Sequence, residues 1–297
     1  MHSHGNDTIT SGITVLESKR LFSEDITRKV INISYPDYWF APVKLSPFAK
    51  TIEEETIKWM DSLNLISNAS TLAHLRAMEP CHYAGYSHSM AAYDHALVYC
   101  KYITMWLLWD DERVEVAKDF SSIEQPLNAL SGELIEKSLD PYMAAFKHIG
   151  DEYERLGASR NWRIRFADKM KEWALNAIQE EAVRRSKHNA DVRDFEDAVK
   201  LRAITVGIRP NSVTLERAVG IELPDYICSH SHYLELIDQA AIICCLINDV
   251  VGVPKDINNN QLNSNLVLYY KSYFKTSLYD AYQAIVELYT PNNPTYS

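Results

Sequence analysis

The chain is poor in glycine and has no linker, repeat or low-complexity stretch. Only 9 glycines occur in 297 residues, and no segment shows strand-like alternation bounded by turn residues. Segments with helical apolar periodicity lie between scattered prolines instead. With 46% hydrophobic residues and no linker, one large domain is favoured over two smaller ones. The composition predicts an all-α protein.

Excess basic charge, a membrane-length apolar run and a leader-like N-terminus are also lacking. The 30 basic and 40 acidic residues give a net charge of −10, which argues against nucleic acid as a partner. No run approaches the ~18 apolar residues of a membrane span, so no stable membrane insertion is expected. Residues 1–7 carry neither a basic nor an apolar leader region, which favours a cytoplasmic location.

The cysteines lack the CxxC spacing of a zinc or redox site. Their number is odd and three of them lie in apolar surroundings, so reduced core thiols are expected rather than a disulfide framework. The five are Cys81, Cys100, Cys228, Cys244 and Cys245.

What the chain does contain is a series of apolar-periodic segments. Residues 1–50 have little periodicity and are expected to form a partly ordered arm, whereas residues 51–297 are expected to form a single helical domain. The expected helices begin near Thr51 and then cover 70–78, 89–111, 141–156, 161–187, 191–207, 211–218, 231–253 and 259–288.

Two acidic clusters follow two of the most apolar segments. The run DDERVE (110–115) follows YITMWLLW, and NDVVGVPKD (248–256) follows AAIICCLI. Carboxylates are costly to bury unless they are paired or bound to metal. Two apolar helices that both end in carboxylates therefore predict an apolar cavity with metal ligands at its rim.

In the first cluster, Glu115 returns to the helix face of Asp111, with Asp110 about 100° away. Carboxylates one turn apart can share Mg²⁺, which leaves its remaining positions to water or phosphate oxygens. The alternative is an ordinary acidic helix end, in which Glu112 and Glu115 are solvated and Arg113 is paired with a neighbour.

In the second cluster, Asn248, Gly252 and Asp256 are spaced i, i+4, i+8 along about 12 Å of one helix face. An amide oxygen and a carboxylate on one face can chelate a cation. Pro254 removes a backbone donor and clashes with the carbonyl of Val250, so the helix is expected to kink or end there. The alternative is that residues 252–254 begin a loop.

Together the clusters resemble the metal-binding motifs of microbial-type class I terpene synthases, DDxx(x)D/E and NDxxSxxxE/D. Gly252 replaces the more usual serine. The matching positions are Asp110, Asp111 and Glu115, then Asn248, Asp249, Gly252 and Asp256. The resemblance covers roughly residues 45–285. It implies a class I terpenoid synthase helical bundle with a central apolar cavity.

The same family places a diphosphate-sensing arginine 46 positions before the asparagine of the second motif, and Arg202 has this spacing from Asn248. For a lone arginine on an amphipathic helix, a salt bridge would be the ordinary explanation. By analogy, Thr205 is the linker of the kinked helix that follows the arginine, and the Val206 carbonyl faces the substrate. Lys255 matches a family lysine that contacts the diphosphate.

The resemblance implies a terpene cyclase that ionises a linear prenyl diphosphate and cyclises the carbocation, releasing diphosphate. Farnesyl diphosphate is the leading substrate and geranylgeranyl diphosphate the next. The chain would act as a monomer or homodimer. Three Mg²⁺ ions, or Mn²⁺ in their place, would be held by Asp110, Asp111, Glu115, Asn248, Asp256 and, through water, Gly252.

Aromatic faces can stabilise the carbocation by roughly 1–2 kcal/mol each when they are desolvated. Trp106 lies one helical turn before Asp110 and is expected to face the same cavity. Tyr83, Tyr86 and Tyr99 are weaker candidates, because core packing is the better explanation for each of them.

The sequence departs from the family at its C-terminal end. The Arg-Tyr pair that usually closes the site follows the second motif by about 80 residues, whereas Ser297 lies 49 residues after Asn248. No arginine follows Arg217. Either the last helices are lacking, or the site closes differently. The alternatives are a non-catalytic or truncated paralogue that binds prenyl diphosphate, a chain-elongating synthase, which would need a second DDxxD motif, and a helical scaffold without ligand.

Overall fold

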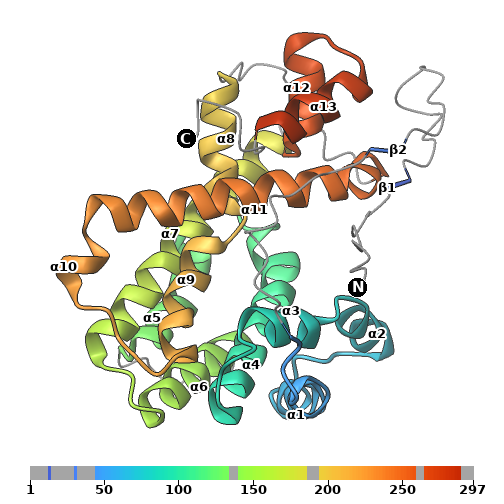
Figure 1. Ribbon diagram of the computed structural model, residues 1–297. Coiled ribbons are helices and arrows are strands. Elements are labelled where there is room, and N and C mark those ends of the chain that lie inside the picture. The colour runs from blue at the N-terminus through green and yellow to red at the C-terminus, as the bar shows by residue number, and fades with distance from the viewer. Residues whose placement is uncertain are drawn as a thin grey trace, which may run out of the picture. The chain divides into compact units, whose positions relative to one another are not determined.

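The computed structural model describes residues 13–14, 30–31, 44–133, 140–185, 194–258 and 264–288, and only the backbone at 13–14, 30–31 and 183–185. Most of the expected arm, residues 1–50, lies outside this part. Helices dominate the described residues (Figure 1). The two strands seen there, β1 (Ile13–Thr14) and β2 (Val30–Ile31), pair antiparallel with Ile13 opposite Ile31.

The chain forms two compact units, and the helices α7 (Arg160–Arg185), α8 (Phe195–Thr205) and α11 (Ser231–Asn258) contribute to both. Unit 1 comprises residues 1–41, 183–202 and 242–297, and unit 2 comprises residues 42–182 and 203–241. That residues 51–297 act as a single domain stays a prediction.

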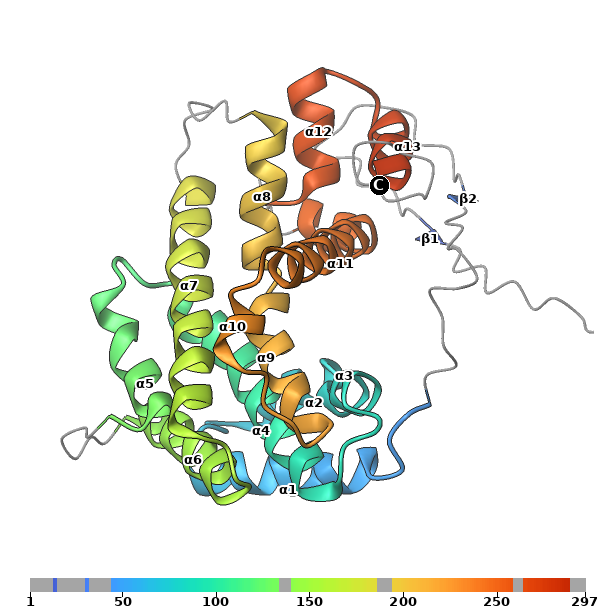
Figure 2. The same cartoon turned by 60° about the vertical axis from the view of Figure 1, so that its left-hand side comes forward.

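Unit 2 is built around α4, which is buried over 12 of its 17 residues. This helix packs against α1, α3, α6 and α9 (Figure 2). Burial on so many faces explains why the segment is apolar all round rather than amphipathic. The elements of unit 2 are α1 (Ala49–Ser62), α2 (Ala69–Ala77), α3 (Pro80–Ser87), α4 (Tyr93–Trp109), the π-helical turn η2 (Asp110–Val114), α5 (Ser121–Ser131), α6 (Pro141–Arg155), most of α7 (Arg160–Arg185), α9 (Ile208–Ala218) and α10 (Asp225–Cys228).

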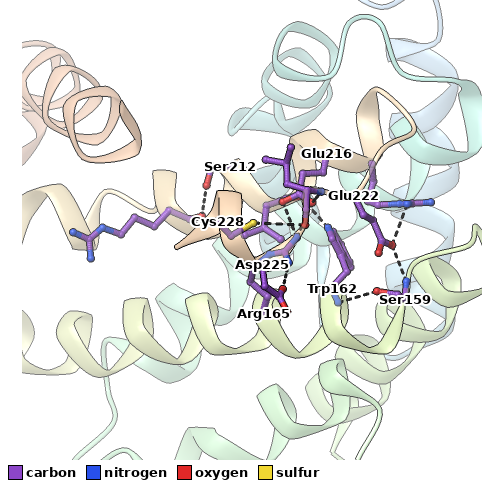
Figure 3. Close-up of polar contacts among 12 residues, drawn as sticks. Ser159, Trp162, Arg165, Ser212, Glu216, Glu222, Asp225 and Cys228 are labelled. Carbon is purple, nitrogen blue, oxygen red and sulfur yellow. Dashed lines mark hydrogen bonds and ion pairs between the residues drawn. The ribbon is translucent and has the colours of Figure 1, made fainter. Parts of the chain in front are cut away.

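A buried carboxylate joins α7, α9 and the loop that leads to α10 (Figure 3). Glu216 is 4% exposed and receives two bonds from Arg165 Nη2, at 2.9 and 2.6 Å. The Leu223 N–H donates to the same carboxylate at 2.8 Å. Because both oxygens have donors, the desolvation of this charge is compensated and the loop is fixed to the helices.

Unit 1 contains the second half of α11 (Ser231–Asn258), most of α8 (Phe195–Thr205), and the helices α12 (Leu266–Phe274) and α13 (Leu278–Leu288). The helices α12 and α13 pack side by side (Figure 1). Phe195 of α8 contacts the rings of Tyr269, Tyr270 and Phe274 on α12. The tyrosines of this region therefore pack between helices.

The predicted helices correspond to observed ones, with three kinds of error. The short helices α3, α5 and α10 were missed, and the single helix expected over 259–288 contains two helices separated by residues 275–277. The helix also does not end at Pro254, so neither helix termination nor a loop at 252–254 is observed. Val253 and Ile257 are 0% and 4% exposed, and their burial supports the last turn against the loss of one backbone bond.

All five cysteines are free, as expected for reduced thiols, and Cys81, Cys100 and Cys245 are buried. Among the described residues, one helix, α11, has the length and composition of a membrane span. Core helices of soluble proteins can have the same length and composition, so the absence of stable membrane insertion stays a prediction.

Candidate active site

The first acidic motif lies in a π-helical turn rather than in the α-helical one assumed from the sequence. The Glu115 N–H donates to the Asp110 carbonyl at 2.9 Å, across five residues. Trp109 and Val114, which flank the acids, are 1% and 0% exposed, whereas Asp111 is exposed and Asp110 half-buried. The wide turn thus keeps the apolar side chains inside while the carboxylates emerge, and π turns are frequent at functional sites.

The exposed acids of this motif have partners on α2 and α6. Asp111 Oδ2 lies 2.9 Å from His74 Nε2. The Tyr142 hydroxyl donates to Glu112 Oε2 at 2.7 Å, and burial together with this bond raises the pKa of Tyr142 well above its usual range. Arg113 lies over the Tyr142 ring and 3.8 Å from Asp140. Arg113 is thus paired with a neighbour, as the alternative of an ordinary acidic helix end expected. Glu112 is exposed but accepts a bond from Tyr142, and Glu115 is half-buried rather than fully solvated.

The second motif is joined to Arg202 inside unit 1. Asp249 is 1% exposed, and its carboxylate receives bonds from Arg202 Nε at 3.1 and 3.2 Å and from Nη2 at 2.9 Å. The Leu266 N–H adds a bond of 2.8 Å. Burial raises the pKa of Asp249 above its ordinary value, and the charge and bonds of Arg202 partly oppose this. Arg202 does form a salt bridge, but its partner belongs to the motif.

Asp256 and Gly252 lie together on the face of α11 that the sequence predicted. A Cβ added at Gly252 would lie 3.0 Å from Asp256 Oδ2. The same oxygen accepts a bond of 2.7 Å from Asn265 Nδ2. Asn248 is exposed one turn before Gly252 on the same helix, and Lys255 is also exposed.

The backbone after Arg202 breaks at the predicted position. The helix α8 ends at Thr205, and Gly207 caps α9 with φ +82°. Trp173 Nε1 donates to the Thr205 carbonyl at 2.9 Å. The residue four positions after Val206 is Pro210, which has no N–H, so α9 cannot supply the usual helical donor to the Val206 carbonyl.

Trp106 contacts this kink. A Cβ at Gly207 would overlap the Trp106 ring, which explains why glycine is required there beyond its positive φ. The ring stacks on Tyr102 at 5.4 Å and meets Trp173 edge-on at 4.8 Å, and Trp106 is 5% exposed. That Trp106 also faces a substrate cavity stays a prediction.

The donor chemistry of both motifs fits a hard divalent cation. Their side chains offer carboxylate and amide oxygens, the ligands that Mg²⁺ and Mn²⁺ prefer. Within the part of the chain that the structure describes, no three His, Cys, Asp or Glu side chains converge into a ready-made metal site.

A family model described as terpene synthase family 2, C-terminal metal binding, matches residues 101–291. The chain belongs to this family. The terpene synthase membership expected from the motifs is thereby confirmed, as is the class of enzyme.

Relatives with assigned products agree with this terpene synthase membership. The (−)-δ-cadinene synthase of Streptomyces clavuligerus is 25% identical over 229 residues, covering 75% of this chain and 68% of that protein. The (−)-β-caryophyllene synthase of Saccharothrix espanaensis, described as cyclising (2E,6E)-farnesyl diphosphate, is 32% identical over 114 residues, which is 38% of this chain and 31% of that protein.

Solved terpene synthases confirm the all-α class I fold. The linalool/nerolidol synthase of Streptomyces clavuligerus has a TM-score of 0.71 at 19% identity, covering 84% of this chain and 83% of that one. Hedycaryol synthase in complex with nerolidol has a TM-score of 0.68 at 19% identity, covering 86% and 82%.

Sequence reasoning missed three residues that contact the candidate site. Asn265 binds both acidic positions of the second motif, Trp173 donates to the Thr205 carbonyl, and His74 contacts Asp111. An asparagine before the apolar run 266–270 is a helix-cap signal that could have identified Asn265 as the start of α12. Its contacts with α11, like those of Trp173 and His74, are long-range and have no local signal.

Proposed function

We propose that this terpene synthase is a Mg²⁺-dependent class I cyclase that ionises a linear prenyl diphosphate, with farnesyl diphosphate first and geranylgeranyl diphosphate next. The contact between Arg202 and Asp249 carries the proposal. It joins Arg202, to which the family resemblance gave the role of diphosphate sensor, to an acid of the second metal-binding motif.

The residues of the two motifs would hold the metal ions. Three Mg²⁺ ions, or Mn²⁺ in their place, would neutralise the charge that develops on the departing diphosphate. Gly252 would take part through water, because it has no side-chain ligand. The proposed ligands are Asp110, Asp111, Glu115, Asn248, Gly252 and Asp256.

The remaining residues would bind and orient the substrate. Arg202 and Lys255 would donate charge-assisted hydrogen bonds to the diphosphate. The Val206 carbonyl, which α9 cannot bind through Pro210, would face the developing carbocation. Trp106 packs against the kink that presents this carbonyl, and its π face would stabilise positive charge.

The chain length of the substrate is proposed by analogy. The relative from Saccharothrix espanaensis cyclises farnesyl diphosphate, and its matched segment is 32% identical to this chain. The alternative function, binding of prenyl diphosphate without turnover, is favoured by one observation, the missing side-chain ligand at Gly252.

The test is product analysis with Mg²⁺ and, separately, C10, C15 and C20 prenyl diphosphates. A cyclised product from the C15 substrate is expected. Asp110→Ala and Asn248→Ala should each lower kcat/KM by about 100-fold or more, since even residues that only orient metal ligands often change affinity or activity 10–100-fold. The control Glu112→Gln lies in the same acidic run but contacts Tyr142, so its activity should stay near that of the wild type.

Undiminished turnover in both alanine variants would remove these motifs from the mechanism. Diphosphate binding without any product from the three substrates would support the non-catalytic alternative.

A further inference from the structure

Asn265 is the N-cap residue of α12, and its side chain is buried, with 1% of the residue exposed. Its Oδ1 accepts bonds from the Val267 and Leu268 N–H groups at 3.0 and 3.3 Å. These partners are donors, so the oxygen must face the helix and the amide nitrogen must face α11. The orientation of the side chain is therefore fixed by the cap.

The amide nitrogen of Asn265 binds two positions of the second motif at once. It donates to Asp256 Oδ2 and to the Asp249 carbonyl, each at 2.7 Å. The next residue, Leu266, donates its N–H to the Asp249 carboxylate. Two successive residues at the start of α12 thus hold both acids of the second motif, Asp249 and Asp256, in place.

Gly252 provides the space for this contact. A Cβ there would lie 3.0 Å from Asp256 Oδ2, closer than ordinary van der Waals contact, and 3.7 Å from Asn265 Nδ2. Any side chain at position 252 would crowd the carboxylate that Asn265 binds. The glycine at the position where the family more often has serine is therefore coupled to Asn265.

We propose that Asn265 is a positioning residue that orients the Asp256 carboxylate toward a divalent cation, and that Gly252 permits this arrangement. The proposal rests on the proposed metal-dependent function. A donor behind a metal-binding carboxylate fixes its rotamer, and loss of such a donor typically lowers metal affinity 10–100-fold. By orienting Asp256, Asn265 would thus contribute to metal affinity and partly compensate for the absence of a side-chain ligand at position 252.

The test separates helix capping from the contact with Asp256. In Asn265→Ser the hydroxyl can still cap α12, but the side chain is too short to donate to Asp256. The matched control is Asn68→Ser, at the cap of α2, where Asn68 accepts from the Thr71 N–H at 3.0 Å. Binding is read from the Tm shift on titrating Mn²⁺ in the presence of inorganic pyrophosphate, and activity from the Mg²⁺ concentration that gives half-maximal turnover.

Asn265→Ser is expected to raise both half-saturating metal concentrations about 10-fold. Asn68→Ser should leave them unchanged, although both variants replace a helix-capping asparagine. Metal titrations of Asn265→Ser that match the wild type would overturn the proposal. A wild-type protein that shows neither turnover nor a metal-dependent Tm shift would instead contradict the proposed function itself.

Gly252→Ala gives an independent route, because alanine is favoured over glycine inside a helix and should not impair folding. The added Cβ is expected to displace Asp256 from Asn265 and weaken metal binding to a similar degree. In the double variant the two effects should not add, since both remove the same contact. Additive effects, or an unchanged metal titration in Gly252→Ala, would contradict the proposal even where Asn265→Ser does not fold.

Discussion

The two acidic motifs use the same chemical groups but are built into the protein in different ways. In the second motif, Asp249 is 1% exposed and paired with Arg202. In the first, the side chain of Asp111 is 46% exposed, and its partner His74 is 53% exposed. One carboxylate is therefore compensated by protein donors inside the fold, whereas the other faces solvent at a π-helical turn.

The two motifs should therefore contribute differently to folding and to cation binding, although both consist of acidic residues. Buried charges are stable only when they are paired, so Arg202 and Asp249 must contribute to folding as well as to any ligand binding. Exposed carboxylates contribute little to folding and keep their capacity for cations. Substitutions in the two motifs should therefore affect stability very differently.

The largest expected effect is on the buried pair. Arg202→Met leaves the Asp249 carboxylate buried without its counter-charge, and the free energy of unfolding should fall by about 3–5 kcal/mol. Urea denaturation of the wild type and the variant measures this. Because Arg202 is paired with a buried acid, its loss should affect the fold as well as any diphosphate binding.

The double variant Arg202→Met/Asp249→Asn distinguishes charge burial from general damage. It removes the unpaired charge while the asparagine oxygen can still accept from the Leu266 N–H, so most of the lost stability should return. Turnover should remain low, because the arginine is still missing. If the double variant were as unstable as the single one, the pair would not be what stabilises this region.

Most of the fold was predictable because its signals are local. The helix expected over 141–156 begins at Pro141, where α6 is observed to begin, and its apolar periodicity is a local signal. The helix α10 was missed because four residues carry too little periodicity, and α5 contains an internal proline, Pro126, which argues against a helix in the sequence. The continuation of α11 through Pro254 was missed because burial of Val253 and Ile257 is a tertiary effect.

The candidate site was predictable as positions but not as contacts. Sequence spacing selected Arg202 and the second motif, and the structure shows that Arg202 binds Asp249. Nothing in the sequence indicated that Asn265 binds the same motif, since the partners are 9 and 16 residues apart. Spacing also implied an α-helical turn at Asp110, where the backbone is π-helical.

The second-largest expected effect on stability concerns His88, which packs against α4, the helix that precedes the first motif. His88 is 2% exposed and stacks on Tyr99 with ring centres 3.4 Å apart. Burial lowers the pKa of His88 to about 3. Because this folded-state pKa lies below the unfolded value, the stability contribution is complete above about pH 6.5 and is lost as the pH falls from there toward 3.

Between pH 7.5 and pH 5, this one residue should lower the free energy of unfolding by about 2 kcal/mol. His88→Phe keeps an aromatic ring against Tyr99 and removes the titration, so its stability should fall less steeply over the same range. Burial also lowers the pKa of His95, so some acid sensitivity should remain in the variant. If the free energies of unfolding of the two proteins changed in parallel with pH, protonation of His88 would not be a cause of the loss of stability in acid.

The smallest effect is expected at the exposed motif and tests the comparison most directly. Asp111→Asn removes an ion pair between two half-exposed side chains, and such pairs contribute about 0–1 kcal/mol. Urea denaturation should therefore show a loss below about 1 kcal/mol, several-fold less than in Arg202→Met. An equally large loss would mean that the first motif is also part of the folding core. Its carboxylates would then be bound by protein groups before any cation binds, and the difference between the buried second motif and the exposed first motif would not hold.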